Sequence, residues 1–360
     1  MLTGKQHKIY TYIDEEVTRK GFAPTLKEIA KHFKLSSTAT AHEHVASLEE
    51  KGYLRRSKGR ARALELVPIE LPLQKLTIPG LLSPAPKRAP LTKNLNRTYL
   101  GDVFDLLAEL PDESVDMVFG DPDYNVGIKY NNNSYTTNFE NYIAWYIALA
   151  QESMRILKKD GNFFMMNYPK QNAHLRVHYL DKKFPLVSEY AWVYNTNVGH
   201  TPQRFTTAHR SILHVRKQEK NKFFKDQVAL PYKNPNDRRI KENLKNGSAG
   251  RMPYSWFEFN LVKNVSKEKT DHACQIPQKL TEMLIRATTR ERDKVLVLFG
   301  GSGAELEICK NLRRDFLSAE IDPKYHAMIE DRLQSGAIHE KYKLKNGKRL
   351  ARGDDFREYL

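Results

Sequence analysis

Asp121-Pro122-Asp123-Tyr124, placed just after the apolar run Val115 to Phe119, is the stretch that decides how this chain folds. The β-branched and apolar run predicts a buried strand, and the proline predicts a turn at its carboxyl end. Asp121 and the Pro122 carbonyl offer acceptors to an amino group, and Tyr124 offers a ring on which a flat base can stack. On these four residues alone, an ordinary corner between a strand and a turn is an equally good interpretation.

The residues that follow predict an α/β domain. Apolar side chains from Ile143 to Leu157 recur at helical spacing, and Lys158 to Gly161 is expected to end that helix. Asn162 to Met166 then predicts another strand, and a strand-helix-strand unit implies a parallel sheet. We expect this domain to extend from residue 93 to residue 360.

A second strand and turn stand near the C-terminus. Lys294 to Leu298 predicts a strand, Phe299-Gly300-Gly301-Ser302-Gly303 predicts a glycine-rich turn, and Ala304 to Leu312 predicts a helix. Such glycines let the backbone approach a ligand, and an acid about 20 residues later, here Glu320 or Asp322, can bind ribose hydroxyls. The turn has neither the Gly-x-Gly-x-x-Gly spacing nor a P-loop lysine, so the pattern favours neither a dinucleotide nor a triphosphate.

The charge balance points to a polyanionic partner. The 360 residues include 59 Lys and Arg against 43 Asp and Glu, a net charge of +16, and nucleic acid is the commonest partner of so basic a chain. From residue 216 to residue 269 the periodicity fades, which predicts an irregular insert. It carries 14 basic against 6 acidic side chains, interleaved with aromatic ones. We expect this insert, with Arg238 and Arg239, to face nucleic acid. A merely basic protein with a solvated surface insertion is the alternative.

Residues 1–67 predict a winged helix-turn-helix domain. Apolar residues from Ile9 to Val17 have helical spacing, Thr25 to Glu28 form a capping box, and a third helix is expected from Thr38 to Lys51. Two short strands then flank a basic wing. We expect polar residues of the third helix to face a major groove and basic residues of the wing to bind phosphates. The residues concerned are Ser37, Thr38, Thr40 and His44, and Arg55, Arg56, Lys58 and Arg60. A winged helix used only for protein contacts is the alternative.

Other features bound the class of protein. Residues 68–92 are rich in proline and predict a semi-rigid linker. Cys274 and Cys309 stand far apart without metal spacing, no apolar signal core or membrane-length apolar run is present, and we expect a soluble cytoplasmic protein. His174 and His178 are four residues apart but lack a third ligand, so a surface pair is expected and no metal.

The first domain closely resembles the DNA-binding domain of LexA-type repressors. The resemblance rests on Leu2-Thr3 and Gln6, Pro24-Thr25 with Glu28-Ile29-Ala30, Glu43-His44, and Lys51-Gly52. In that family a self-cleaving serine-lysine peptidase follows, and nothing in this sequence supplies one.

Residues 97–333 resemble the permuted β group of DNA amino-methyltransferases that use S-adenosylmethionine. The family order is Asp-Pro-Pro-Tyr, a target-recognition region, a His-Pro-Thr-Gln-Lys-Pro-like segment and a final cofactor loop. Here the order is Asp121 to Tyr124, the basic insert, His272 to Pro277, and Val297 to Ala304. The sequence departs from the family at Asp123, at Val297-Leu298 and at Ala304.

This resemblance implies a Rossmann-like methyltransferase sheet with helices on both faces, after the small winged domain. It implies S-adenosylmethionine as cofactor and double-stranded DNA as partner, and the family's use of Asp at the first position favours N6 of adenine. The implied catalytic residues are Asp121, Pro122 and Tyr124; the implied cofactor residues are Phe299, Gly300, Gly301, Ser302, Gly303, Glu320, Asp322, Gln275, Pro277 and Asp102.

Several alternatives stay open at this point. One is methylation of N4 of cytosine, a second is a DNA-binding repressor with a catalytically silent methyltransferase domain, and a third is a methyltransferase of structured RNA, which the winged helix argues against. The sequence also leaves open a homodimer and a cognate nuclease of a restriction-modification system.

Overall fold

The computed structural model describes residues 4–20, 22–50, 53–56, 64–66, 95–130, 133–135, 137–196, 202–262 and 268–343. The chain divides into two units, Met1–Leu76 and Thr77–Leu360, and each is considered by itself. The predicted linker 68–92 lies outside the described residues, as do Lys58, Arg60 and the side chain of Arg56. The domain limits 1–67 and 93–360 therefore remain predictions.

The first unit is built from three helices and a two-stranded hairpin. Its elements are α1 (Gly4–Lys20), α2 (Leu26–His32), α3 (Thr38–Glu50), β1 (Leu54–Arg56) and β2 (Leu64–Leu66). The capping box is confirmed: the Glu28 amide donates to the Thr25 hydroxyl at 3.2 Å, and the Thr25 amide donates to the Glu28 carboxylate at 2.6 Å. Ile9 and Ile13 of α1 are buried against the other helices, as the helical spacing predicts.

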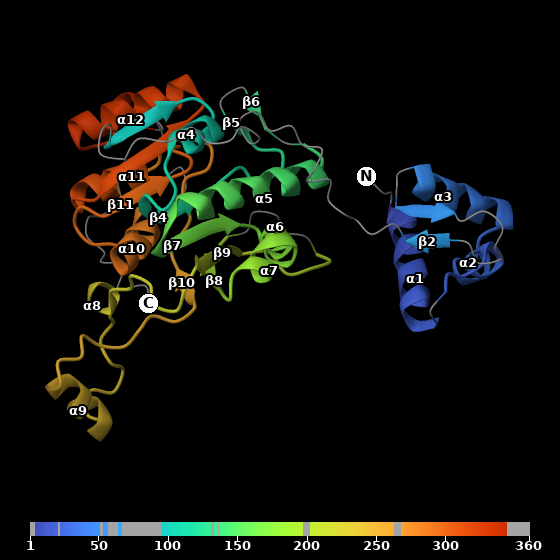
Figure 1. Ribbon diagram of the computed structural model, residues 1–360, viewed down its shortest axis with the longest axis horizontal. Coiled ribbons are helices and arrows are strands. Elements are labelled where there is room, and N and C mark those ends of the chain that lie inside the picture. The colour runs from blue at the N-terminus through green and yellow to red at the C-terminus, as the bar shows by residue number, and fades with distance from the viewer. Residues whose placement is uncertain are drawn as a thin grey trace. The chain divides into compact units, whose positions relative to one another are not determined.

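The second unit is organised around a single eight-stranded sheet (Figure 1). In chain order the strands are β3 (Arg97–Leu100), β4 (Val115–Gly120), β7 (Leu157–Asn167), β8 (Leu186–Val193), β9 (His209–Arg216), β10 (Trp256–Glu258), β11 (Lys294–Val297) and β12 (Asp315–Glu320). Their order in space is β10-β8-β9-β7-β4-β11-β12-β3, and only β9 runs antiparallel to its neighbours. A separate small hairpin pairs β5 (Lys129–Tyr130) with β6 (Asn133–Ser134).

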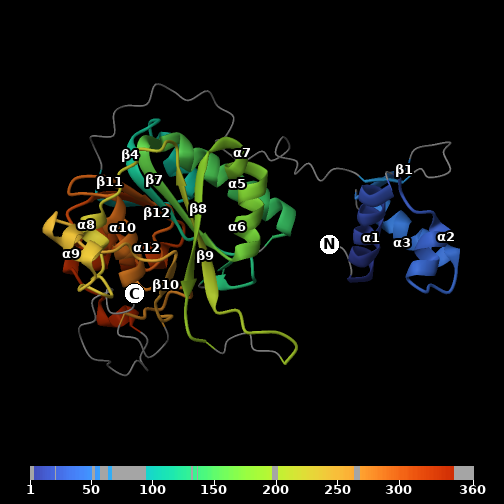
Figure 2. The same cartoon turned by 90° about the horizontal axis from the view of Figure 1, so that it is seen from below.

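Helices cover both faces of this sheet, as expected (Figure 2). One layer consists of α4 (Val103–Glu109), α5 (Phe139–Ile156) and α6 (Pro169–Leu175), and the other of α10 (Gln278–Thr288), α11 (Ala304–Asn311) and α12 (Pro323–Ser335). Shorter elements are a π-helical turn (Arg176–Leu180), α7 (Asp181–Lys183), α8 (Lys225–Val228), α9 (Arg238–Lys245) and a 3-10 turn (Glu340–Tyr342). Within the described ranges, no helix is long and apolar enough to cross a membrane.

The two predicted strand ends meet at the centre of the sheet. All six residues of β4 are buried, which explains the apolar side chains of Val115, Met117, Val118 and Phe119; the one charged residue, Asp116, is paired within the sheet. β11 pairs with it in parallel, with Val297 opposite Phe119, and the Leu298 amide donates to the Phe119 carbonyl at 2.9 Å. The turns that begin at Asp121 and at Phe299 therefore leave neighbouring strands at the same edge, the edge where parallel sheets bind ligands.

Two local predictions were wrong. Leu157 does not belong to the helix: α5 ends at Ile156, and Leu157 to Gly161 form the irregular start of β7. The register between β4 and β7 shifts there, and a Cβ on Gly161 would lie 2.8 Å from the Asp116 carbonyl, so the lone glycine marks a close approach of backbones. The basic insert is also not wholly irregular, because Trp256 to Glu258 add β10 to the edge of the sheet beside β8.

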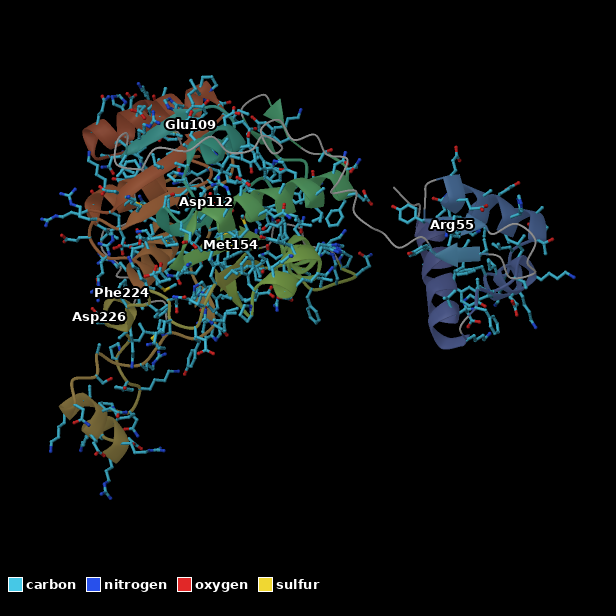
Figure 3. All side chains as sticks on the ribbon, in the orientation of Figure 1. Arg55, Glu109, Asp112, Met154, Phe224 and Asp226 are labelled. Atoms are coloured by element: carbon cyan, nitrogen blue, oxygen red, sulfur yellow. The ribbon has the colours of Figure 1, made fainter. Side chains whose placement is uncertain are left out.

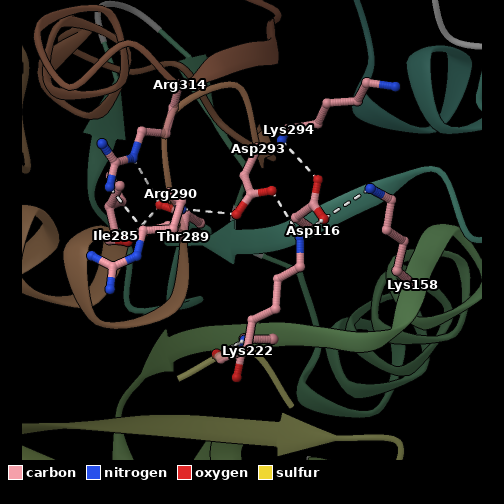
Figure 4. Close-up of polar contacts among 10 residues, drawn as sticks. Asp116, Lys158, Lys222, Ile285, Thr289, Arg290, Asp293, Lys294 and Arg314 are labelled. Carbon is pink, nitrogen blue, oxygen red and sulfur yellow. Dashed lines mark hydrogen bonds and ion pairs between the residues drawn. The ribbon is translucent and has the colours of Figure 1, made fainter. Parts of the chain in front are cut away.

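An ion network joins the strands at the end of β4 opposite the ligand edge (Figure 4). Asp116 is 1% exposed and accepts Lys158 at 2.8 Å, Lys222 at 2.7 Å and the Lys294 amide at 2.9 Å. Lys222 also donates to Asp293 at 2.8 Å. Burial alone would raise the pKa of Asp116, but these hydrogen bonds hold it below its usual value. The network ties β4, β7 and β11 together.

Candidate active site

The turn after β4 is held in place by its own neighbours. The Asp123 carboxylate accepts the Asn125 amide at 2.8 Å, and Asn125 has a left-handed conformation with φ of 60°. The Asp123 carbonyl accepts the Tyr142 hydroxyl at 2.7 Å, and the Tyr124 carbonyl accepts the Gln171 amide group at 2.8 Å. The path of the backbone from Asp123 to Asn125 is therefore fixed.

The Pro122 carbonyl differs from the two carbonyls that follow it. Pro122 is buried, yet no donor from the described residues makes a hydrogen bond to its carbonyl oxygen. Asp121 precedes it, and its Oδ1 accepts the Tyr124 hydroxyl. The turn thus presents one carboxylate and one free peptide carbonyl, two acceptors separated by a single residue.

The electrostatics of this turn suit an acceptor near neutral pH. Burial raises the pKa of Asp121 to about 6, although the Tyr124 hydrogen bond and the charge of Arg210 pull it down. Asp121 is therefore ionised at pH 7 and protonated at mildly acidic pH. Burial and the charge of Asp121 raise the pKa of Tyr124 well above its usual value, so this hydroxyl stays a donor.

Asp123 occupies the place where the resembled family has a second proline. Its Oδ1 bonds to the Asn125 amide, so a hydrogen bond supplies the stiffness that a proline ring would give. Its Oδ2 is buried, and burial raises the pKa of the carboxyl group although the Asn125 amide and the Tyr130 side chain lower it. The departure from the family motif therefore preserves a defined turn.

The glycine-rich turn, residues 299–303, lies against the end of β12. The Gly300 amide donates to the Ala319 carbonyl at 2.8 Å, and the Gly301 amide donates to the Glu320 carboxylate at 2.8 Å. Gly301 and Gly303 have φ of 53° and 73°, a region in which other residues are strained. Burial raises the pKa of Glu320 although amide groups donate to it. The turn and Glu320 thus form one side of a candidate cofactor site.

Asp322 and Asp102 cap helices. The Asp322 carboxylate accepts the Lys324 amide at 2.8 Å at the start of α12, and the Asp102 carboxylate accepts the Phe104 amide at 2.8 Å at the start of α4. Glu320 instead bonds to the glycine-rich turn. This difference separates Glu320 from Asp322, which the sequence could not do.

The segment around His272 packs on the same glycine-rich turn. The His272 ring lies 3.4 Å from the position that a Cβ on Gly301 would take. The Gln275 side chain accepts the Thr270 amide at 3.1 Å, and Pro277 is the N-cap of α10. Gln275 and Pro277 thus hold the segment in shape, and the Gln275 amide group is bonded to the Glu268 carbonyl at 2.6 Å. Their role at a cofactor stays a prediction.

Sequence reasoning named Tyr124 but missed two further tyrosines and an arginine that pack beside it. The Arg210 guanidinium lies 3.9 Å from the centroid of the Tyr168 ring, 5.2 Å from that of Tyr194 and 5.5 Å from that of Tyr124. We call these four residues the tyrosine–arginine cluster. Tyr168 directly follows β7 and Tyr194 directly follows β8, so their place after a strand was the available signal.

Between Leu230 and Arg251 the predicted DNA-facing insert forms an arm that extends from the second unit (Figure 1). Its two sides are joined where Leu230 and Arg251 exchange amide hydrogen bonds of 2.9 and 2.8 Å, and α9 lies at its tip. Arg239 is 89% exposed in its side chain, and its nearest acid is Asp237 at 3.6 Å. Phe224 and Asp226, labelled in Figure 3, mark α8 at the base of the arm. Arg238 and Arg239 therefore lie on α9, away from Asp121.

In the first unit, α3 buries Ala41, Val45 and Leu48 and turns its other side outward. The predicted groove-facing residues Ser37 and Thr38 are exposed, and Thr40 and His44 are partly buried. Ser37 also accepts the Thr40 amide at 3.2 Å. Arg55 is exposed on β1 (Figure 3).

The two histidines of the second unit that stand four residues apart are half-buried. The rings of His174 and His178 stack at 5.4 Å, and charge repulsion adds to burial in lowering the pKa of His174. Among the described residues no group of three or more His, Cys, Asp or Glu could hold a metal ion.

Comparisons with known proteins match both units. Residues 115–331 match a family model described as DNA methylase, for N6 and N4 methyltransferases, and residues 1–63 match the LexA DNA binding domain. Type II methyltransferase M.BglII of Bacillus subtilis is 30% identical over 249 residues, covering 65% of this chain and 67% of that protein. DNA adenine methyltransferase YhdJ of Escherichia coli (strain K12) is 26% identical over 259 residues, covering 71% and 88%.

Matches to the first unit cover less of the chain, and the solved structures are less similar in sequence. The LexA repressor of Staphylococcus aureus (strain Mu3 / ATCC 700698) is 46% identical over 66 residues, only 18% of this chain and 32% of that protein. The structure of the PvuII DNA methyltransferase, described as cytosine-N4-specific, is 19% identical, covers 68% of this chain and 96% of that chain, and has a TM-score of 0.48.

Proposed function

Because this chain belongs to the family of N6 and N4 DNA methylases, we propose that it methylates N6 of adenine at a specific sequence in double-stranded DNA. The observation that carries the proposal is the pair of acceptors after β4, Asp121 and the Pro122 carbonyl. The pair lies next to the glycine-rich turn that follows β11. A base amine bound by the pair would therefore lie beside a methyl donor bound at that turn.

The two acceptors fit the chemistry of an exocyclic amine. Such an amine is a poor nucleophile because its lone pair is delocalised into the ring. Hydrogen bonds from its two N–H groups to Asp121 and to the Pro122 carbonyl favour a pyramidal nitrogen whose lone pair points at the incoming methyl group. The protein contributes mainly by positioning and by fixed acceptors.

The methyl donor is S-adenosylmethionine, which supplies an electrophilic methyl group on its sulfonium when bound. The glycine-rich turn would lie along the donor, and Glu320 would accept its ribose hydroxyls. Val297 stands where the resembled family has an acid, but a different acid is available. Glu305, in the first turn of α11, is 6% exposed, and its carboxylate bonds to its own backbone amide. No ion pair to it is found among the described residues.

Glu305 fits the ammonium group of the donor's methionine part. Its closest cationic candidate, Arg332, is engaged by Glu307 at 2.6 Å and by the Ser302 carbonyl at 2.9 Å. A buried carboxylate that lacks a protein cation is strongly stabilised when a ligand supplies one. Burial raises the pKa of Glu305 to about 7, with the charge of Asp121 adding to the effect.

The choice of adenine rests on the first residue of the motif. The resembled family uses Asp at this position for adenine, and the relative YhdJ is by its name a DNA adenine methyltransferase. To react, the base must leave the duplex, and Tyr124 would then stack on it.

Sequencing of modified bases tests the proposal. Genomic or plasmid DNA is incubated with the protein and S-adenosylmethionine, with the Asp121→Ala variant as control. We expect 6-methyladenine at one short sequence with wild type and none with the variant. Methylation of cytosine N4 would refute the choice of base, and undiminished methylation by Asp121→Ala would refute the site.

The match of residues 1–63 to the LexA DNA binding domain favours a second DNA-binding function in the same chain. We propose that this unit tethers the methyltransferase to DNA and so raises its local concentration there. A repressor that reads an operator is the competing proposal.

A further inference from the structure

Arg210 holds a position that the reaction as proposed does not explain. Its guanidinium donates to the His209 carbonyl at 3.2 Å and to the Tyr194 hydroxyl, and its closest ring contact is the face of Tyr168. It lies near enough to Asp121 for its charge to lower the pKa of that carboxyl group. A cation is thus stacked among aromatic rings next to the catalytic acid.

The topology places this cluster on the substrate side of Asp121. The three tyrosines follow the carboxyl ends of parallel strands: Tyr124 follows β4, Tyr168 follows β7 and Tyr194 follows β8. Arg210 is the second residue of β9, which is antiparallel and therefore begins at the same edge of the sheet. The strand order is β8-β9-β7-β4-β11, so the cluster and the glycine-rich turn flank Asp121 from opposite sides. A base that enters opposite the methyl donor therefore enters at the cluster.

The base-binding surfaces of the turn are covered in this structure. The Tyr124 hydroxyl is engaged by Asp121, the edge of its ring packs at 74° and 5.3 Å against Tyr168, and Arg210 lies toward its face. A guanidinium is flat and delocalised and stacks on aromatic rings as a base does. The stacking of a guanidinium and the stacking of a base on aromatic rings have similar strengths, so one can replace the other.

We propose that Arg210 occupies the base pocket of the DNA-free protein and that the extruded target base displaces it from the tyrosine–arginine cluster. This inference rests on the proposed function, because it gives Arg210 a role at the site where the base is methylated. Arg210 is then a gate: a base must displace it to enter the pocket. Bases that make few other contacts with the protein enter less readily, and in this way Arg210 contributes to specificity.

A pH experiment separates displacement from a lasting contact. The acidic limb of kcat/KM reports Asp121 in the free enzyme, and the limb of kcat reports it in the complex with DNA. In Arg210→Ala the charge beside Asp121 is lost, so we expect the kcat/KM limb to move to higher pH while the kcat limb stays in place. Arg210→Lys, which keeps the charge, should retain the wild-type kcat/KM limb. A matching shift of the kcat limb in Arg210→Ala would show that Arg210 remains beside Asp121, and would overturn the proposal.

A fluorescence experiment does not depend on turnover. The duplex carries 2-aminopurine at the adenine that sequencing has shown to be methylated by wild type, a result that establishes the proposed function beforehand. At saturating protein, Arg210→Ala should increase the extruded fraction relative to wild type by about fivefold or more, because a competing cation–π contact is lost. An unchanged or smaller extruded fraction, with S-adenosylhomocysteine binding intact as a check on folding, would refute the gate.

Discussion

At the scale of the residue, Asp121 balances two demands. In the proposed reaction it accepts a hydrogen bond from the base within a buried site, and burial raises its pKa to about 6. In the unfolded chain the same group titrates near 3.8. The charged form is therefore disfavoured in the folded state, so this side chain reduces stability at neutral pH while it provides function.

Asp121→Asn should change stability and activity in opposite directions. Methylation should be lost, whereas the free energy of unfolding at pH 8 should rise by about 1–3 kcal/mol because the penalty of a buried charge is removed. Because folding raises the pKa of Asp121, the gain in the free energy of unfolding depends on pH. The gain is full above pH 6, becomes smaller as the pH falls, and vanishes below about pH 4, where Asp121 of wild type is protonated in both the folded and the unfolded state.

Tryptophan fluorescence can follow this unfolding selectively, because Trp145, Trp192 and Trp256 all lie in the second unit. Methylation by wild type should also fall as pH drops through 6. Equal stability of Asp121→Asn and wild type across pH 4–8 would contradict the burial argument.

Glu305 leads to a prediction about cofactor binding that needs no DNA. S-adenosylhomocysteine carries the ammonium group, and 5′-methylthioadenosine lacks it while sharing the adenosine. Glu305→Gln should weaken binding of the first by about 10–100-fold, the loss of one charge-assisted hydrogen bond, and leave the second unchanged. For wild type, affinity for S-adenosylhomocysteine should fall as pH drops below about 7, where Glu305 becomes protonated. Calorimetry measures both constants.

Glu320→Gln is the matched control for this experiment. We propose Glu320 as the residue that binds the ribose, which both ligands share, so its substitution should weaken the binding of both alike. Equal losses for both ligands in Glu305→Gln would instead place Glu305 away from the ammonium group.

At the scale of the element, the sequence predicted most of the helices, strands and turns that are determined by residues close together in the chain. The capping box at Thr25, the apolar strand β4 and the glycines before α11 each signal their structure within a few residues. The prediction failed at Leu157, because the register shift that places it in β7 depends on a partner strand distant in sequence. It missed β10 for the same reason, since Trp256 to Glu258 gain their strand only by pairing with β8.

The site shows the same division. Asp121 and the glycine-rich turn could be found because each has a motif. Tyr168, Tyr194 and Arg210 could not, because three strands bring them together and none has a motif of its own. Glu320 was separated from Asp322 only by the hydrogen bonds that each makes.

The arm that carries α9 is an element whose role can be tested by charge. Arg238→Ala with Arg239→Ala should weaken DNA binding and reduce the slope of log affinity against log salt by about 1.8, since each lost phosphate contact contributes about 0.9. Binding of S-adenosylhomocysteine should not change. Fluorescence anisotropy across a salt series measures the slope.

The control for the arm is Arg292→Ala with Arg313→Ala. These side chains are 82% and 75% exposed and precede β11 and β12, at the edge of the sheet opposite Asp121. The control removes the same charge and should leave the salt slope nearly unchanged. Equal slopes for both double variants would show that the arm does not contact phosphates.

At the scale of the whole molecule, two DNA-binding units share one chain, and the question is how their activities combine. A tether acts through local concentration, so it lowers the DNA concentration needed for half-maximal rate and leaves the chemical step alone. A repressor instead requires the first unit to hold one operator, independently of methylation. The two proposals therefore differ in which measured quantity a change in the first unit alters.

Thr38→Glu is suited to distinguish them in the full chain. Thr38 is exposed in the first turn of α3, where an acid stabilises the helix, so the unit should stay folded while the new charge repels DNA. Under the tether we expect KM for DNA to rise about tenfold with kcat unchanged, and the effect to shrink at high salt. Thr38→Ala separates loss of the hydroxyl from the added charge and should change KM much less. Unchanged methylation kinetics, together with lost binding to a single promoter fragment, would refute the tether and establish the repressor, because the first unit would then act on DNA that the methyltransferase does not need.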